Sequence, residues 1–328
     1  MDNPNTLICG LPLPESSGSY EHKTRLRKID GPDGSSTLIP YRVYVYPPLQ
    51  RFVLEGEGRE KVGVKVFYCD GNAMNLDSHH SLLTEYVRSF YNHLQYLHPR
   101  HDITVFILNW DYPKYGLAPG PLPSQDIVVM TKRHAVEMYN HVFLPAYRDI
   151  ATTLIHVVHG YSLGSGVACH LYATIDPTHI DLILLSAAFT GIHTYQAPTW
   201  WTKLKSIVYA DFFANYQILK QNKRVAGNND RVMIQLAELD AIFPLEVNFA
   251  RFVRVVRDTD ICVVEGVDHV WFATLESIPQ TVELLSDRIE IPITVSSHPL
   301  RQQRVGLRLR DVPSPAPATP PALDLDLD

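Results

Sequence analysis

The chain has 328 residues, of which 45% are hydrophobic and 20% charged, and its formal net charge at pH 7 is -6. This length provides for a large hydrophobic core in one or two domains. Its acidic balance argues against a protein that binds nucleic acid through the phosphates. No run approaches 18 apolar residues, so we expect no transmembrane segment.

The four cysteines fall singly, with no C-x-x-C pair, at Cys9, Cys69, Cys169 and Cys262. This pattern indicates reduced thiols and neither a disulfide framework nor a zinc site. The first residues show no secretory signal, and the chain has no N-x-[ST] sequon. We therefore expect a cytoplasmic protein without a metal, and leave peripheral membrane contact and the oligomeric state open.

Both ends of the chain differ in composition from the rest of the sequence. Residues 1–20 are rich in Pro, Ser and Gly, and the last eighteen read DVPSPAPATPPALDLDLD. Such segments bury too little apolar surface to fold. We predict a flexible segment over residues 1–20, one domain over 21–295 and a disordered tail over 296–328.

The domain opens with a predicted hairpin, whose strands at residues 23–29 and 38–48 flank the turn DGPDGSS. Apolar runs typical of buried strands follow at residues 62–69, 102–110, 152–160, 179–189, 231–239 and 260–266. Segments with helical spacing alternate with them at residues 79–97, 124–146, 165–175, 245–257 and 277–289. This alternation predicts an α/β fold with a mostly parallel central sheet and helices on both faces.

The stretch HGYSLGSG, residues 159–166, places Ser162 in a G-x-S-x-G motif between an apolar strand and a helix. A sharp strand-to-helix turn of this kind exposes a serine hydroxyl for acyl chemistry. Gly160 and Gly164 leave room for so tight a bend. The alternative is that Ser162 has only a structural role in the turn.

A nucleophilic serine needs a histidine base and a carboxylate that orients it, in the chain order serine, acid, histidine for this architecture. Asp240 and His269 follow the ends of the last two predicted strands, so they fit that order. Glu238 is a rival acid but lies further inside its strand, and Asp240 would also suit a helix N-cap. His156 and His159 point to opposite faces of a strand, which is poor metal geometry.

An oxyanion hole needs two donors. The backbone N–H of Leu163, directly after the serine, is one candidate. The other is the N–H of Asn72, in the loop CDGNAMNLD that follows the third strand. A simple turn rich in turn-forming residues is the alternative for that loop.

Four segments resemble the α/β-hydrolase superfamily and, within it, the Bem46-like branch of serine hydrolases: DGNAMNL, NWDYPKYGLAPG, GYSLGSGVA and AAFTGIHTYQAP…ADFFANYQIL. The resemblance covers about residues 60–290. It implies an α/β-hydrolase fold, no cofactor, and a catalytic triad of Ser162, Asp240 and His269. The implied activity is hydrolysis of small acyl esters or thioesters, as in an esterase, lipase or acyl-protein thioesterase of lipid metabolism. Asp70 departs from the branch, which usually has histidine there, and a carboxylate aimed into the site would oppose an oxyanion.

We predict a small cap over residues 190–230. Its aromatic residues Trp200, Trp201, Tyr209 and Phe212 are candidates for lining a substrate pocket, although such rings often serve a segment's own packing. Two other functions stay open: a catalytically silent hydrolase fold used for binding, and a serine peptidase.

Overall fold

The computed structural model describes residues 24–30, 34, 36–49, 59–72, 74–116, 118–119, 127–149, 151–191, 213–226, 229–257 and 260–269. Several predictions fall outside these residues: the segment 1–20, the helix at 277–289, the tail 296–328 and the four cap aromatics at positions 200, 201, 209 and 212. They stay predictions.

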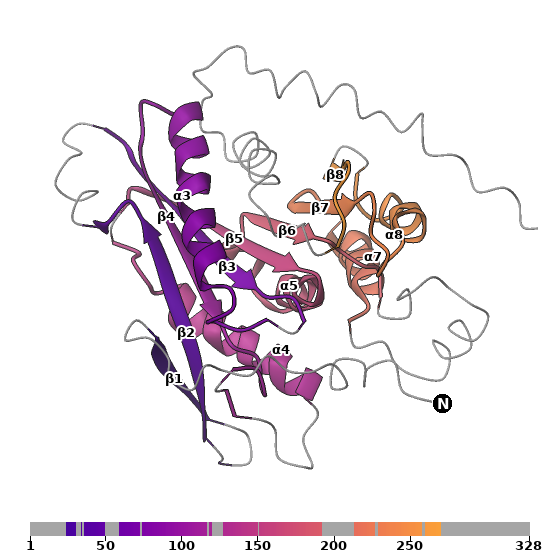
Figure 1. Ribbon diagram of the computed structural model, residues 1–328, viewed down its shortest axis with the longest axis horizontal. Helices are drawn as coiled ribbons and strands as arrows, with labels where there is room; N and C mark the ends of the chain where they lie inside the picture. Colours follow the sequence, from indigo (N-terminus) through magenta and orange to yellow (C-terminus); the bar gives the residue numbers. More distant parts are fainter. Residues whose placement is uncertain are drawn as a thin grey trace, which may run out of the picture. The chain divides into compact units, whose positions relative to one another are not determined.

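In the described part of the chain, eight strands form one sheet in the spatial order β1-β2-β4-β3-β5-β6-β7-β8 (Figure 1). Their bounds are Arg25–Asp30, Ser36–Tyr46, Lys61–Cys69, Asp102–Trp110, Thr153–Tyr161, Leu182–Ser186, Val232–Ala237 and Ile261–Val264, from β1 to β8. β2 is antiparallel to both of its neighbours, whereas every pair from β4 to β8 is parallel. The predicted opening hairpin and mostly parallel sheet are confirmed.

Helices cover both faces of the sheet (Figure 1). One face packs against α3 (His80–Leu97), and the other packs against α4 (Ile127–Met138), α5 (Leu163–Thr174), α7 (Asn215–Ala226) and α8 (Leu245–Phe252). Strand β5 shows how the sequence divides between the two cores. Ile155, Val157 and Tyr161 join the cluster around α3, while Val158 joins the cluster on the opposite face.

Two elements differ in length from their sequence pattern. The helix predicted over residues 124–146 is regular only to Met138 and continues as a π-helical turn, Tyr139–Phe143. The strand predicted over 179–189 begins only at Leu182, after a 3₁₀ turn, Pro177–His179. It ends at Ser186 because Ala187 has a φ of 47°, which no extended strand accommodates.

Part of the stretch predicted to be a cap lies on the body of the fold. Helix α7 packs against α5, and the Asn215 side chain at its start donates to Ser165 Oγ (3.0 Å) and to the Phe189 carbonyl (2.8 Å). α7 thus forms part of the connection from β6 to β7. Residues 192–212 of the same stretch lie outside the described residues.

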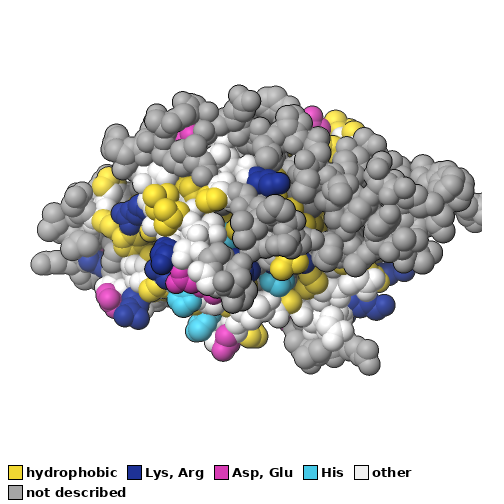
Figure 2. Space-filling model, turned by 90° about the horizontal axis from the view of Figure 1, so that it is seen from below, with side chains coloured by type: hydrophobic (Ala, Val, Ile, Leu, Met, Phe, Trp, Pro, Cys, Tyr) yellow, Lys and Arg dark blue, Asp and Glu magenta, His cyan; other side chains and the backbone are white. Residues whose placement is uncertain are grey.

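The surface carries mixed charge. On the face in Figure 2, basic, acidic and histidine side chains of the described residues are interspersed with apolar ones. The described residues on this face form no broad basic field of the kind that binds nucleic acid. Within the described part of the chain, no helix combines the length and apolar character that crossing a membrane requires.

Candidate active site

Ser162 occupies a strained turn between β5 and α5. Its φ of 51° and ψ of -116° lie in a region that costs a non-glycine residue on the order of 1–3 kcal/mol. The Ser162 backbone N–H donates to the Ser186 carbonyl at the end of β6 (2.9 Å), which fixes the turn to the neighbouring strand. The turn is thus the nucleophile-elbow geometry that the G-x-S-x-G motif predicts.

Two glycines let the elbow close. A Cβ on Gly164 would lie 1.9 Å from the Cys69 carbonyl oxygen, and a Cβ on Gly160 would lie 2.3 Å from the Gly164 carbonyl oxygen. Both neighbours are backbone atoms and cannot rotate away. The first turn of α5 therefore rests directly on the end of β3, which brings the loop after β3 beside the serine.

The three residues of the predicted triad form one hydrogen-bonded chain. Ser162 Oγ lies 2.7 Å from His269 Nε2, and His269 Nδ1 lies 2.7 Å from Asp240 Oδ2. All three residues are buried, with 7–8% of their surface exposed. Because a carboxylate only accepts, the imidazole carries its proton on Nδ1 and presents Nε2 as the acceptor for the serine hydroxyl.

Asp240 has two tasks, one for each oxygen. Oδ2 contacts the histidine, while Oδ1 accepts the backbone N–H groups of Ile242 (2.9 Å) and Phe243 (2.8 Å). Asp240 is not the N-cap of α8, because Pro244 occupies that position; its two bonds hold the turn that precedes the helix. The rival acid Glu238 is exposed and accepts the Gly266 N–H (2.8 Å), so it braces the turn after β8.

Tyr161 connects the elbow to the histidine. Its hydroxyl donates to the His269 carbonyl (2.7 Å), and its ring lies against Gly71, where an added Cβ would meet ring atoms at 2.8 Å. Burial raises the pKa of Tyr161, with a further contribution from the Asp240 carboxylate, so the phenol stays neutral and donates. Sequence reasoning missed this residue.

The loop after β3, which carries the candidate donor Asn72, is held by two tyrosines that follow β4. Tyr112 donates to the Asp70 carbonyl (2.9 Å), and Tyr115 donates to Asn72 Oδ1 (2.5 Å). Leu163, the other candidate donor, is the first residue of α5, so its backbone N–H has no partner within the helix. The positive end of the α5 dipole lies at the same point.

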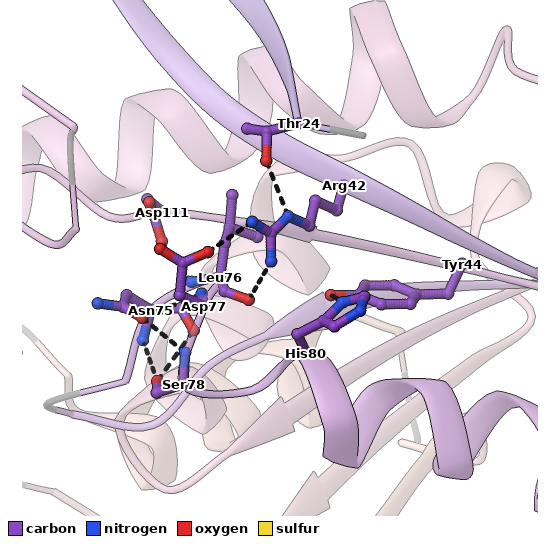
Figure 3. A network of polar contacts seen from close by, with 9 residues as sticks. All are labelled: Thr24, Arg42, Tyr44, Asn75, Leu76, Asp77, Ser78, His80 and Asp111. Carbon is purple, nitrogen blue, oxygen red and sulfur yellow. Dashed lines mark hydrogen bonds and ion pairs between the residues drawn. The ribbon is translucent and has the colours of Figure 1, made fainter. Parts of the chain in front are cut away.

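Farther along, this loop is braced from β2 and β4 (Figure 3). The Arg42 guanidinium donates to the Leu76 carbonyl (2.7 Å) and to Asp77 Oδ1 (2.5 Å). Asp111, just after β4, accepts the Leu76 N–H (2.9 Å). Arg42 is buried, so these bonds tie the loop to the sheet from the interior.

Asp70, the residue that departs from the family pattern, is buried and does not carry a free carboxylate. Its Oδ1 lies 2.5 Å from His79 Nδ1, an ion-pair contact without the alignment of a hydrogen bond. Burial alone would lower the pKa of His79, but the Asp70 charge outweighs burial and holds it above the usual 6.5.

His156 and His159 lie on opposite faces of β5, as expected. His159 lies 2.8 Å from Ser186 Oγ and 3.1 Å from the Tyr86 hydroxyl, and burial lowers its pKa to about 3. His156 lies near Asp181, with a pKa that burial lowers to about 4. Among the described residues, no three His, Cys, Asp or Glu side chains group closely enough to hold a metal.

A small apolar depression borders Leu163. It has room for about one water molecule. Its walls come from the loop after β4, from α4 and from the segment just before α7, through Tyr112, Tyr115, Ile127, Val128, Thr131 and Phe213.

The sheet order, the elbow and the flanking helices define an α/β-hydrolase fold. Comparison with solved structures agrees with this class. The peroxisomal alpha-beta-hydrolase Lpx1 from Saccharomyces cerevisiae matches with a TM-score of 0.52 at 10% identity, over 87% of this chain and 96% of that one.

Two further structures are similar. The alpha/beta hydrolase domain-containing protein 10 from mouse has a TM-score of 0.47 at 15% identity, over 81% of this chain and 100% of that one. An esterase from Pyrococcus furiosus has a TM-score of 0.47 at 13% identity, over 84% and 97%. At such identities the likeness concerns the fold alone. No protein-family model and no curated protein sequence matched the chain.

Proposed function

We propose that the protein is a serine hydrolase that cleaves carboxylic esters or thioesters through an acyl-enzyme. The observation that carries this proposal is the chain of two 2.7 Å contacts from Ser162 through His269 to Asp240, at an elbow where the serine backbone is strained. Strain of this kind concentrates at functional sites.

In the proposed mechanism, His269 Nε2 takes the hydroxyl proton as Ser162 Oγ attacks the acyl carbonyl carbon. Asp240 keeps the imidazole in the required tautomer and stabilises the imidazolium that forms. The backbone N–H groups of Leu163 and Asn72 receive the oxyanion, aided by the α5 dipole. His269 then protonates the leaving alcohol or thiol, and water hydrolyses the acyl-enzyme by the same route.

Among the described residues that line the apolar depression beside Leu163, none carries a charged side chain that would select a peptide residue, so we keep the acyl substrate that the resemblance implies. The resemblance of the four quoted segments supports placing the chain in the Bem46-like branch. The silent-fold alternative drew its support from Asp70, and the pairing of that carboxylate with His79 weakens the alternative.

The test is a panel of p-nitrophenyl esters and acyl thioesters of graded chain length, assayed with the wild type and Ser162→Ala. We expect turnover by the wild type and a fall in kcat of at least about 10³-fold in the variant. The matched control is Ser81→Ala, on the exposed surface of α3, which should retain full activity. Equal hydrolysis by wild type and Ser162→Ala, or none by either, would exclude the proposal.

A further inference from the structure

The turn between β3 and α3 contains a buried charged pair outside the Ser162–His269–Asp240 chain. The Asp70 and His79 side chains are only 3% and 6% exposed, and their nearest charged atoms lie 2.5 Å apart. A buried carboxylate without a counter-charge is strongly destabilising. Asp70 can therefore stay ionised at this buried position only because His79 pairs with it.

The pair closes the loop that carries Asn72. Asp70 directly precedes Gly71 and Asn72, while His79 lies at the start of α3, after the loop has turned back. The Asp70 carbonyl is held separately by the Tyr112 hydroxyl. Because both the main chain and the side chain of Asp70 are fixed, this residue sets the direction of the backbone at Gly71 and Asn72.

Charge matters here as well as position. The Asp70 carboxylate adds to burial in raising the pKa values of Tyr68 and Tyr112, so negative charge nearby is disfavoured. The same field would oppose an oxyanion formed beside Asn72. A protonated His79 cancels that field at its source.

The Asp70 charge outweighs burial and raises the pKa of His79 above its usual 6.5. Burial raises the pKa values of the surrounding phenols and thiol, which therefore stay neutral near pH 7: Tyr44 on β2, Tyr68 and Cys69 on β3, Tyr86 on α3, Tyr112 after β4 and Tyr161 on β5. Among the described residues, the other titratable or charged groups around the turn include the Arg42–Asp77 ion pair, Asp111 and Tyr115 after β4, His80 beside Tyr44, and His159 beside Tyr68.

We propose that Asp70 and His79 are positioning residues for the oxyanion hole, and that the rate of hydrolysis depends on His79 staying protonated. The inference rests on the proposed function. Loss of the His79 proton leaves the Asp70 carboxylate uncompensated next to the loop, so the transition state loses stabilisation while substrate binding does not change. The effect falls on kcat, because the oxyanion exists only in the transition state.

The experiment compares kcat and KM from pH 6 to 10 for the wild type, His79→Gln, Asp70→Asn and the double variant, on the best substrate of the panel. We expect His79→Gln to lower kcat roughly 10- to 100-fold with KM changed less than about twofold. The double variant, which carries no buried charge, should recover most of that loss. The alkaline decline of kcat in the wild type should vanish in Asp70→Asn and in the double variant, and persist in His80→Gln, the adjacent-histidine control.

Thermal unfolding supplies a second readout. The pair contributes stability that is complete below a histidine's unfolded pKa of 6.5 and is lost as pH rises through the raised pKa of His79. A purely structural pair would lower the Tm of both single variants while leaving the shape of the kcat profile unchanged, and that result would overturn this inference alone. Absence of Ser162-dependent hydrolysis by the wild type would overturn the proposed function and this inference together.

Discussion

Ser162 can hold its strained conformation only because its neighbours are small or firmly bonded. Gly164 is the most constrained of them, since a methyl group there would overlap the Cys69 carbonyl at 1.9 Å. That contact joins the first turn of α5 to the loop with Asn72. Adding one methyl group at position 164 therefore tests whether function requires the close packing of α5 against the end of β3.

We expect Gly164→Ala to lower the free energy of unfolding by about 2–3 kcal/mol and to abolish most of the activity, because α5 must move away from β3. Urea unfolding and the ester assay measure the two effects. Gly34→Ala is the matched control: its Cβ meets nothing within 4 Å, so only its φ of +78° should cost stability, about 1 kcal/mol, with activity intact. A Gly164→Ala enzyme with normal stability and rate would show that the packing is not as tight as described.

Among the elements, the carboxyl ends of β3, β5, β7 and β8 bring the site together from distant parts of the chain. β5 ends at the elbow, the residues after β7 and β8 supply Asp240 and His269, and β3 leads into the loop with Asn72. The Tyr161 hydroxyl links two of these ends through its bond to the His269 carbonyl. The position of the histidine thus depends on β5 as well as on β8.

We expect Tyr161→Phe to lower kcat about tenfold with little change in KM, because His269 loses an anchor while the substrate contacts remain. The stability cost should be about 1 kcal/mol, as for one buried hydrogen bond. Steady-state kinetics and thermal unfolding measure these effects. Tyr96→Phe, at a ring 57% exposed on α3, is the control and should change neither. An unchanged kcat in Tyr161→Phe would show that the Tyr161 hydrogen bond is not needed to position His269.

Elements with a strong local pattern could be predicted from the sequence. Continuous apolar runs indicated β3, β4 and β5, and the G-x-S-x-G motif placed the elbow to the residue. The end of β6 could not be predicted, because an alanine in an apolar run gives no local signal of the positive φ at which the strand ends. The Asp70–His79 pair and the Tyr161 anchor also escaped prediction, since no periodicity relates residues that meet through the return of a loop or across 108 positions.

At the scale of the whole molecule, buried histidines make stability depend on pH. Burial lowers the pKa of His134 to about 4 and that of His159 to about 3, against 6.5 in the unfolded chain. Below pH 6.5 the unfolded chain therefore binds protons that the folded protein does not. As the pH falls from 6.5 toward the pKa of the folded state, each such histidine lowers the free energy of unfolding by up to about 1.4 kcal/mol per pH unit.

His134 offers a clean test, because neither of its ring nitrogens has a hydrogen-bond partner among the described residues. When the pH is lowered from 7.5 to 5, the free energy of unfolding of His134→Leu should fall by about 2 kcal/mol less than that of the wild type. Urea unfolding at the two pH values gives the difference. His141→Leu, at a side chain 54% exposed, should behave as the wild type does. The same pH dependence in His134→Leu and wild type would contradict the burial assigned to His134.

The central claim is that Ser162 is an activated nucleophile, and intact-mass analysis after fluorophosphonate labelling tests it most directly. The wild type should gain one adduct on Ser162, while Ser162→Ala and His269→Ala should gain none under the same conditions. His141→Ala, which changes an exposed histidine, should label as the wild type does. A folded wild-type protein that forms no adduct, or one labelled equally in Ser162→Ala, would contradict the account and leave the silent binding fold as the better description.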